Sequence, residues 1–96
     1  MNIKYLQVAK DEFHDAIRYY EIQQTNLGKQ FQDDVKKSIS RIKRFPKAYE
    51  VVRDEIRRCL LHKFSYSILY TIDEHNIVII AISHQHRKPD YWLGRL

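Results

Sequence analysis

The sequence predicts an α+β fold in which an N-terminal strand and a helical hairpin pack on a twisted, mainly antiparallel sheet. Apolar residues recur at helical spacing in the first half of the chain, and strand-forming residues dominate after Pro46. The breaks between the later runs are only two or three residues long, which favours antiparallel neighbours and a meander. With 96 residues, 44% of them hydrophobic, we expect residues 1–96 to form a single domain.

The first two predicted elements differ in their apolar spacing. Residues 3–8 alternate in a way that suits a short strand with both faces partly covered. From about Ala9 the apolar residues fall at i, i+3, i+4 and i+7, which predicts a helix that ends near Gln24. This stripe consists of Phe13, Ala16, Ile17 and Tyr20.

A second helix is expected directly after the first. Thr25 and Asn26 carry side-chain oxygens that can cap its first amide groups. Its apolar stripe consists of Leu27, Phe31, Val35, Ile39 and Ile42. The helix should end near Arg44, because Phe45 precedes Pro46 and the residue before a proline disfavours the helical conformation.

β-branched and aromatic residues predict four strands in the remainder of the chain. The predicted strands span residues 49–53, 56–64, 66–73 and 77–84. Residues 77–82 are apolar at every position, which favours a central strand with the helices on one face and further cover on the other. Residues 89–96 are expected to form a short tail or a single helical turn.

Charge is unevenly distributed along this basic chain, which has 17 Lys and Arg against 12 Asp and Glu and a net charge of +5. Residues 11–34 contain six acidic and two basic residues (−4), whereas residues 36–63 contain ten basic and three acidic ones (+7). Such a chain favours acidic partners. Lys36, Lys37 and Arg44 lie opposite the apolar stripe of the second helix, where they either bind such a partner or form an ordinary solvated face.

The sequence disfavours secreted and membrane-spanning proteins. Cys59 is the only cysteine, so no intramolecular disulfide is expected, and the N-terminus lacks the basic-then-apolar layout of a signal peptide. The longest apolar run, residues 77–82, is far shorter than the roughly 20 residues that a membrane-spanning helix needs. We therefore expect a cytoplasmic protein with no membrane role.

Two adjacent arginines, Arg57 and Arg58, lie in a predicted strand. Neighbouring strand residues point to opposite faces, so one arginine must approach the helix-covered face or its rim. That arginine needs a carboxylate, phosphate or carbonyl partner. A structural pairing with an acid of the neighbouring turns (Asp54, Glu55 or Asp73) is the alternative to a role in binding.

The C-terminal stretch is the densest group of residues able to carry chemistry. It contains His84, His86, Arg87, Lys88, Tyr91, Trp92 and Arg95. These residues offer proton carriers, phosphate binders and stacking surfaces. The alternative is that the two aromatic rings cover the sheet while the charges stay in solvent.

No metal or cofactor is expected. His84 and His86 have a spacing that suits metal ligation, but a zinc site needs three or four ligands and no second Cys or His pair supplies them. The chain also lacks a phosphate-binding glycine loop, a serine nucleophile motif and a paired-cysteine signature.

Several stretches of the chain together carry a family resemblance. They are "FPKAYEVV", "IRRCLLHKFSYSILYTI" and "IVIIAISHQHRKPDYWLGRL". Their main features are Phe31, the Phe45-Pro46 helix stop, Arg57-Arg58, Phe64-Ser65-Tyr66 leading to Tyr70, and the closing His84, Arg87, Pro89, Tyr91, Trp92 and Arg95. Because these features follow one another in this order, the chain resembles the RelE/ParE superfamily of bacterial toxins from type II toxin-antitoxin pairs. The resemblance covers essentially the whole chain. Ser65 stands where many relatives have a proline.

The resemblance implies a growth-inhibiting, plasmid-stabilising toxin that a partly disordered cognate antitoxin wraps and neutralises. One branch of the superfamily, ParE, poisons DNA gyrase without being a nuclease, and the other, RelE, cuts messenger RNA on the ribosome. The closing pattern His84-x-x-Arg87-x-Pro89-x-Tyr91-Trp92 is more similar to ParE, which implies no catalytic residue. A non-toxic interaction module, such as a decayed toxin, is the third possibility.

The candidate residues differ between these readings. Under the nuclease alternative, His84 or Tyr91 would act as acid or base, with Arg57, Arg58 and Arg87 as phosphate clamps. Under either toxin reading, we expect the following residues to form one surface that binds the target or the antitoxin: Lys36, Lys37, Arg44, Arg57, Arg58, Lys63, His84, His86, Arg87, Tyr91, Trp92 and Arg95.

Overall fold

A computed structural model describes the whole chain, residues 1–96, and has the predicted order of a strand, two helices and four strands. The elements are β1 (Asn2–Tyr5), α1 (Gln7–Gln23), α2 (Leu27–Arg44), β2 (Glu50–Arg53), β3 (Ile56–Leu60), β4 (Tyr66–Asp73) and β5 (Asn76–His84). Residues 89–94 form successive turns without a helix. Neither helix is long and apolar enough to cross a bilayer.

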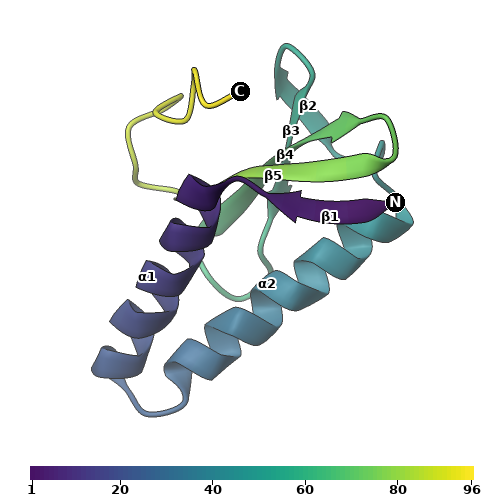
Figure 1. Cartoon of the computed structure of the whole chain (residues 1–96). Helices are drawn as coiled ribbons and strands as arrows, with labels where there is room; N and C mark the ends of the chain where they lie inside the picture. The colour runs from purple at the N-terminus through teal and green to yellow at the C-terminus, as the bar shows by residue number, and fades with distance from the viewer.

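The five strands form one sheet in the order β1-β5-β4-β3-β2 (Figure 1). Strands β2 to β5 form the predicted antiparallel meander, and β1 joins its edge parallel to β5. The middle strand is β4, and β5, which the sequence predicted to be central, lies next to it with a partner on both sides.

The helices cover one face of the sheet, and the C-terminal segment lies on the other face (Figure 1). The larger core cluster joins buried residues of both helices to the sheet, and Ile79 and Ile82 of β5 belong to it. Ile80 and Ala81 of the same strand pack with Trp92 in a smaller cluster on the opposite face. The prediction that both faces of β5 are covered is therefore confirmed.

The first strand ends earlier than the sequence predicted, because Leu6 passes the chain directly from sheet to helix. The N–H of Leu6 completes the parallel ladder by donating to the Ile79 carbonyl, and its own carbonyl accepts from the Lys10 N–H, at 3.0 Å in both cases. Helix α1 consequently begins at Gln7 rather than near Ala9.

The expectation that Thr25 or Asn26 caps α2 through its side chain is wrong. Asn26 adopts a left-handed conformation (φ 72°) and makes no side-chain capping bond. Glu21 of α1 caps the helix instead, since its carboxylate accepts the N–H groups of Asn26 (3.0 Å) and Gly28 (3.1 Å). The helices approach so closely here that a Cβ at Gly28 would lie 2.6 Å from the Ile17 carbonyl oxygen.

Strand β3 ends at Leu60 rather than at Phe64, because a buried carboxylate captures the following backbone. Asp34 of α2, only 4% exposed, accepts the N–H groups of His62 (3.3 Å) and Lys63 (2.8 Å). Those amides are then unavailable to a sheet ladder, and residues 62–65 bend as a loop towards α2.

Candidate functional site

A hollow of about 350 Å³ lies at the junction of β3, β4, the end of β5 and the segment that follows it. We call it the basic hollow. Its lining consists of Arg58, Leu60, Ser67, Leu69, Ser83, His84, Gln85, Arg87, Lys88 and Pro89. The strand register builds it, because Arg58 lies opposite Leu69, and Ser67 lies opposite both Leu60 and Ser83. Leu69 belongs to the cluster of Trp92, so the basic hollow opens on the face away from the helices.

Positive charge dominates the basic hollow. Three of its residues are cationic and none is acidic. Arg58 forms an ion pair with Glu50 at 3.2 Å, but both side chains are largely exposed and such pairs contribute little. Arg87 and Lys88 form no ion pair within the chain. Arg87 and Lys88 therefore have no counter-ion within the chain, and Arg58 has only a weak one, so an anionic ligand can be met by all three.

His84 stands at the end of β5 in a short column of aromatic rings. Its ring lies 5.0 Å from the rings of both Tyr66 and His86. The His86 backbone N–H donates to Nδ1 of His84 at 3.1 Å, so in the neutral imidazole the proton is on Nε2. His84 and Arg87 also line a second hollow of about 250 Å³, on the α1 side. His86 itself is exposed and lines neither hollow.

Tyr91 is fixed by contacts within the chain. The guanidinium of Arg87 lies 3.9 Å above its ring, and its hydroxyl donates to Glu12 at 2.7 Å. Burial raises the pKa of the Tyr91 phenol, and the bond to Glu12 raises it further. Tyr91 therefore stays protonated near neutral pH and is poorly suited to act as a base.

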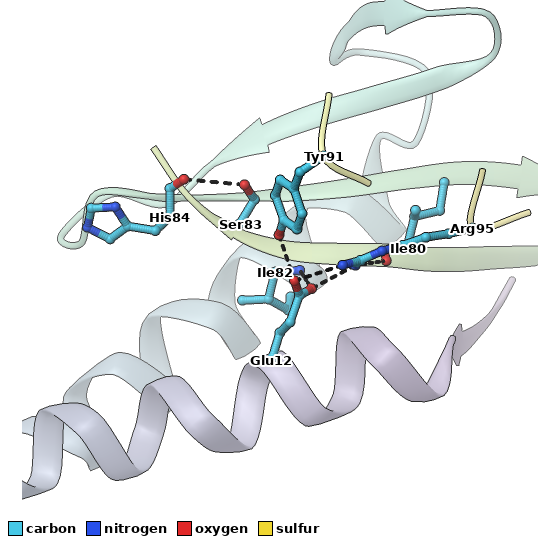
Figure 2. A network of polar contacts seen from close by, with 7 residues as sticks. All are labelled: Glu12, Ile80, Ile82, Ser83, His84, Tyr91 and Arg95. Atoms are coloured by element: carbon cyan, nitrogen blue, oxygen red, sulfur yellow. Dashed lines mark hydrogen bonds and ion pairs between the residues drawn. The ribbon is translucent and has the colours of Figure 1, made fainter. Parts of the chain in front are cut away.

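Glu12 is the residue that organises the C-terminal segment, and the sequence analysis missed it. Its carboxylate accepts the Ile82 N–H (3.1 Å), the Tyr91 hydroxyl and both terminal nitrogens of Arg95 (2.9 and 3.1 Å), as Figure 2 shows. Arg95 also donates to the Ile80 carbonyl at 3.0 Å. Beyond the end of β1, the side chains of Glu12 and Arg95 thus hydrogen-bond the backbone groups of β5.

A sequence signal for Glu12 existed. The residue lies three positions after Ala9 and four before Ala16, and both alanines are buried. An acid on the small-residue side of a buried helix stripe needs a polar partner. What the sequence did not indicate was that this partner would come from the far end of the chain.

Arg57 and Arg58 divide between the two faces of the sheet as expected, but the partner of Arg57 was not foreseen. Arg57 donates to the backbone carbonyls of Lys47 (3.1 Å) and Tyr49 (2.7 Å) and pairs with no acid. The alternative pairing with Asp54, Glu55 or Asp73 is therefore wrong for Arg57. Arg57 supports the loop before β2 and does not line the basic hollow.

The remaining candidate residues lie elsewhere. Lys36, Lys37 and Arg44 are exposed on α2, which covers the other face of the sheet. Lys37 and Lys63 line a separate hollow of about 80 Å³. Trp92 is 6% exposed and lies in the core, and the Arg95 side chain is 16% exposed and ion-paired with Glu12. These residues therefore do not form the single surface that the sequence predicted. The largest group that shares a hollow is Arg58, His84 and Arg87.

The arrangement suits anion binding better than acid-base catalysis. His84 lines the basic hollow, but Tyr91 is engaged by Glu12, and Arg57 lies on the other face. No group of three or more His, Cys, Asp or Glu side chains could hold a metal ion.

Comparison with known proteins assigns the family. A family model described as "ParE toxin of type II toxin-antitoxin system, parDE" matches residues 3–89. Among solved structures, one described as "Chromosomal ParDE TA system from P. aeruginosa" is similar with a TM-score of 0.64 and 13% sequence identity, covering 88% of this chain and 95% of that one. At this identity the likeness concerns the fold, which it confirms as α+β. No curated protein matches the chain. The match over residues 3–89 places the chain in the family of ParE toxins of type II toxin-antitoxin systems.

Proposed function

We propose that the protein inhibits bacterial growth by poisoning DNA gyrase and that a cognate antitoxin neutralises it in the cytoplasm. The family match over residues 3–89 carries this proposal. The division of the predicted nuclease residues supports it, because Arg57 bonds to backbone carbonyls and Tyr91 to Glu12. A binding poison needs no catalytic set, only a surface complementary to its target.

The decisive experiment adds the purified full-length chain to gyrase and relaxed plasmid. We expect supercoiling to stop or cleaved DNA to accumulate. Because a basic protein could simply sequester the plasmid, the matched control starts from the supercoiled form of the same plasmid and measures its relaxation by a type I topoisomerase, which should proceed unchanged. Normal supercoiling with the protein in clear molar excess over gyrase would refute the proposal.

A messenger RNA endoribonuclease acting on the ribosome is the second candidate. The observation that favours it is the gathering of Arg58, His84 and Arg87 around one hollow. Primer extension on translated messages tests this reading. Codon-linked cuts in a toxic culture would favour the nuclease, and their absence with toxicity intact would remove it.

Neutralisation by an antitoxin is supported by charge and by exposed apolar side chains. The antitoxin should present acidic residues to the +7 segment, residues 36–63, and apolar ones to α1, where Tyr19 is 57% and Ile22 77% exposed. Added salt should therefore slow association more than it weakens the complex, which stopped-flow mixing can measure.

Expression of the chain alone should arrest growth, and co-expression of the neighbouring gene should restore it. Unchanged growth with the chain alone would indicate a non-toxic module.

A further inference from the structure

The hydrogen-bonding groups of the basic hollow are not all used by the chain. Ser67 is 5% exposed, yet its hydroxyl makes no hydrogen bond and lines the hollow. The register pairs it with Ser83, whose hydroxyl donates to the His84 carbonyl at 3.3 Å. No buried side-chain oxygen or nitrogen of the chain lacks a partner, so the Ser67 hydroxyl is open to the contents of the hollow. This hydroxyl is therefore available to hydrogen-bond a ligand that enters the hollow.

The walls of the basic hollow supply three cations, and one of them, Arg87, is held in a defined position. Arg87 stacks on the Tyr91 ring at 3.9 Å, and this ring in turn is fixed by Glu12. Stacking fixes the guanidinium plane and leaves its in-plane N–H groups available. Arg58 reaches the hollow from β3, and Lys88 from the segment after β5. Two guanidinium forks, an ammonium and serine hydroxyls make a donor set for a tetrahedral anion.

We propose that the basic hollow binds a phosphodiester of the DNA backbone. A phosphate offers oxygens in several directions at once, which matches donors that come from three strands and from the segment after β5. An acidic peptide fits less well, because a segment that folds on binding needs apolar surface and only Leu60 and Leu69 supply it here. The choice of DNA over RNA rests on the proposed function, since DNA is what gyrase holds.

The test measures the binding of the full-length chain to a short labelled DNA duplex by fluorescence anisotropy at several salt concentrations. The double variant Arg58→Ala/Lys88→Ala removes two cations from the basic hollow. The matched control, Lys36→Ala/Lys37→Ala, removes the same charge from α2. We expect the hollow variant to bind about tenfold or more weakly and to lower the salt slope by about two, and the control to stay within about twofold of the parent.

A third variant, Ser67→Ala, keeps every charge and probes the unpaired hydroxyl directly. It should weaken duplex binding by about threefold or more, the effect of one lost hydrogen bond. Circular dichroism and thermal unfolding establish that each variant is folded. A variant that does not fold is replaced by Arg58→Gln/Lys88→Gln, which keeps more of the side-chain packing.

Each outcome has one meaning. Equal weakening by the hollow and control variants would overturn the site, because net charge alone would then explain binding. Preference for a single-stranded RNA of matched length, or displacement of the duplex by a polyglutamate peptide at equal charge, would overturn DNA as the ligand. Duplex binding that follows the expected pattern without any effect on gyrase supercoiling would refute the proposed function and leave the site intact. Inhibition of gyrase by the hollow variant at parental strength would leave the proposed function intact and overturn the site.

Discussion

Glu12 and Arg95, 83 positions apart in the chain, form a two-pronged ion pair with nitrogen-oxygen distances of 2.9 and 3.1 Å (Figure 2). Both side chains are largely buried, with 15% and 16% exposure. The pair raises the pKa of the Arg95 guanidinium, chiefly through its hydrogen bonds to Glu12. It holds the segment that carries Tyr91 and Trp92 against the sheet, and so it determines the surroundings of the basic hollow.

The variant Glu12→Gln should destabilise the fold by about 2 to 4 kcal/mol, because it leaves the Arg95 charge partly buried without a counter-ion. Urea unfolding followed by the fluorescence of Trp92, the only tryptophan, measures this. Asp11→Asn is the matched control, since that side chain is exposed and accepts one bond from Gln7. The control should change stability by less than about 0.5 kcal/mol. Equal effects of both variants would show that the ion pair contributes nothing.

The variant Asp34→Asn should lower stability by about 1 to 3 kcal/mol and loosen the loop after β3. An amide has only one acceptor oxygen, so either the His62 or the Lys63 N–H loses its partner. Hydrogen exchange at these two amides should become faster. The adjacent Asp33→Asn, which breaks an exposed pair with Lys29, is the control and should leave both exchange rates unchanged.

Gly28→Ala should destabilise the helical hairpin by about 1 to 3 kcal/mol, because the new Cβ would meet the backbone of α1. The Ile17 carbonyl oxygen that it would contact belongs to a regular helix and cannot move aside cheaply. Gly94→Ala is the comparison: nothing lies within 4 Å, and only its positive φ of 85° opposes the substitution. Thermal unfolding should show the larger loss at Gly28. A larger loss at Gly94 would mean that the helices separate easily.

The protein should lose stability in strong alkali. Burial raises the pKa of both Tyr66 and Tyr70 to about 12. A raised pKa favours the protonated phenol in the fold, so this stabilisation is complete below about pH 10 and is lost as the pH rises through about 12. For the fully buried Tyr70 the slope is about 1.4 kcal/mol per pH unit in that window.

The variant Tyr70→Phe tests this pH dependence. It loses the hydrogen bond from the phenol to the Pro46 carbonyl (2.6 Å), so it should be less stable at neutral pH. Its stability should nevertheless fall less steeply between pH 10 and 12 than that of the parent, as urea unfolding at a series of pH values would reveal. An unchanged alkaline slope would contradict a raised pKa for Tyr70.

The sequence predicted the elements well because their signals are local. The stripe from Leu27 to Ile42 follows helical spacing, and the residue before Pro46 stops the helix within one position. The ends that differ are those set by distant partners: Leu6 by its bond to Ile79, and Leu60 by the capture of the next amides by Asp34. No local pattern carries that information.

The candidate site was predicted only in part, for a similar reason. Arg58, His84 and Arg87 were predicted to lie together, but within a larger group of residues, because which members meet depends on the register of three strands. Arg95 and Trp92 are polar or amphipathic residues near a chain end, where exposure is the usual expectation. Both are instead largely buried, because Glu12 and the open face of the sheet provide partners that lie far away in the sequence.

The parallel pairing of β1 with β5 has a consequence for how the protein is made. Both helices and three strands separate β1 from β5, so β1 has no neighbour in the sheet until all of these elements have been synthesised. Arg95, which clamps α1 through Glu12, follows β5 in the chain and is synthesised later still. We therefore expect a nascent chain to keep β1 unpaired and α1 unclamped until the segment from β5 to Arg95 has left the ribosome.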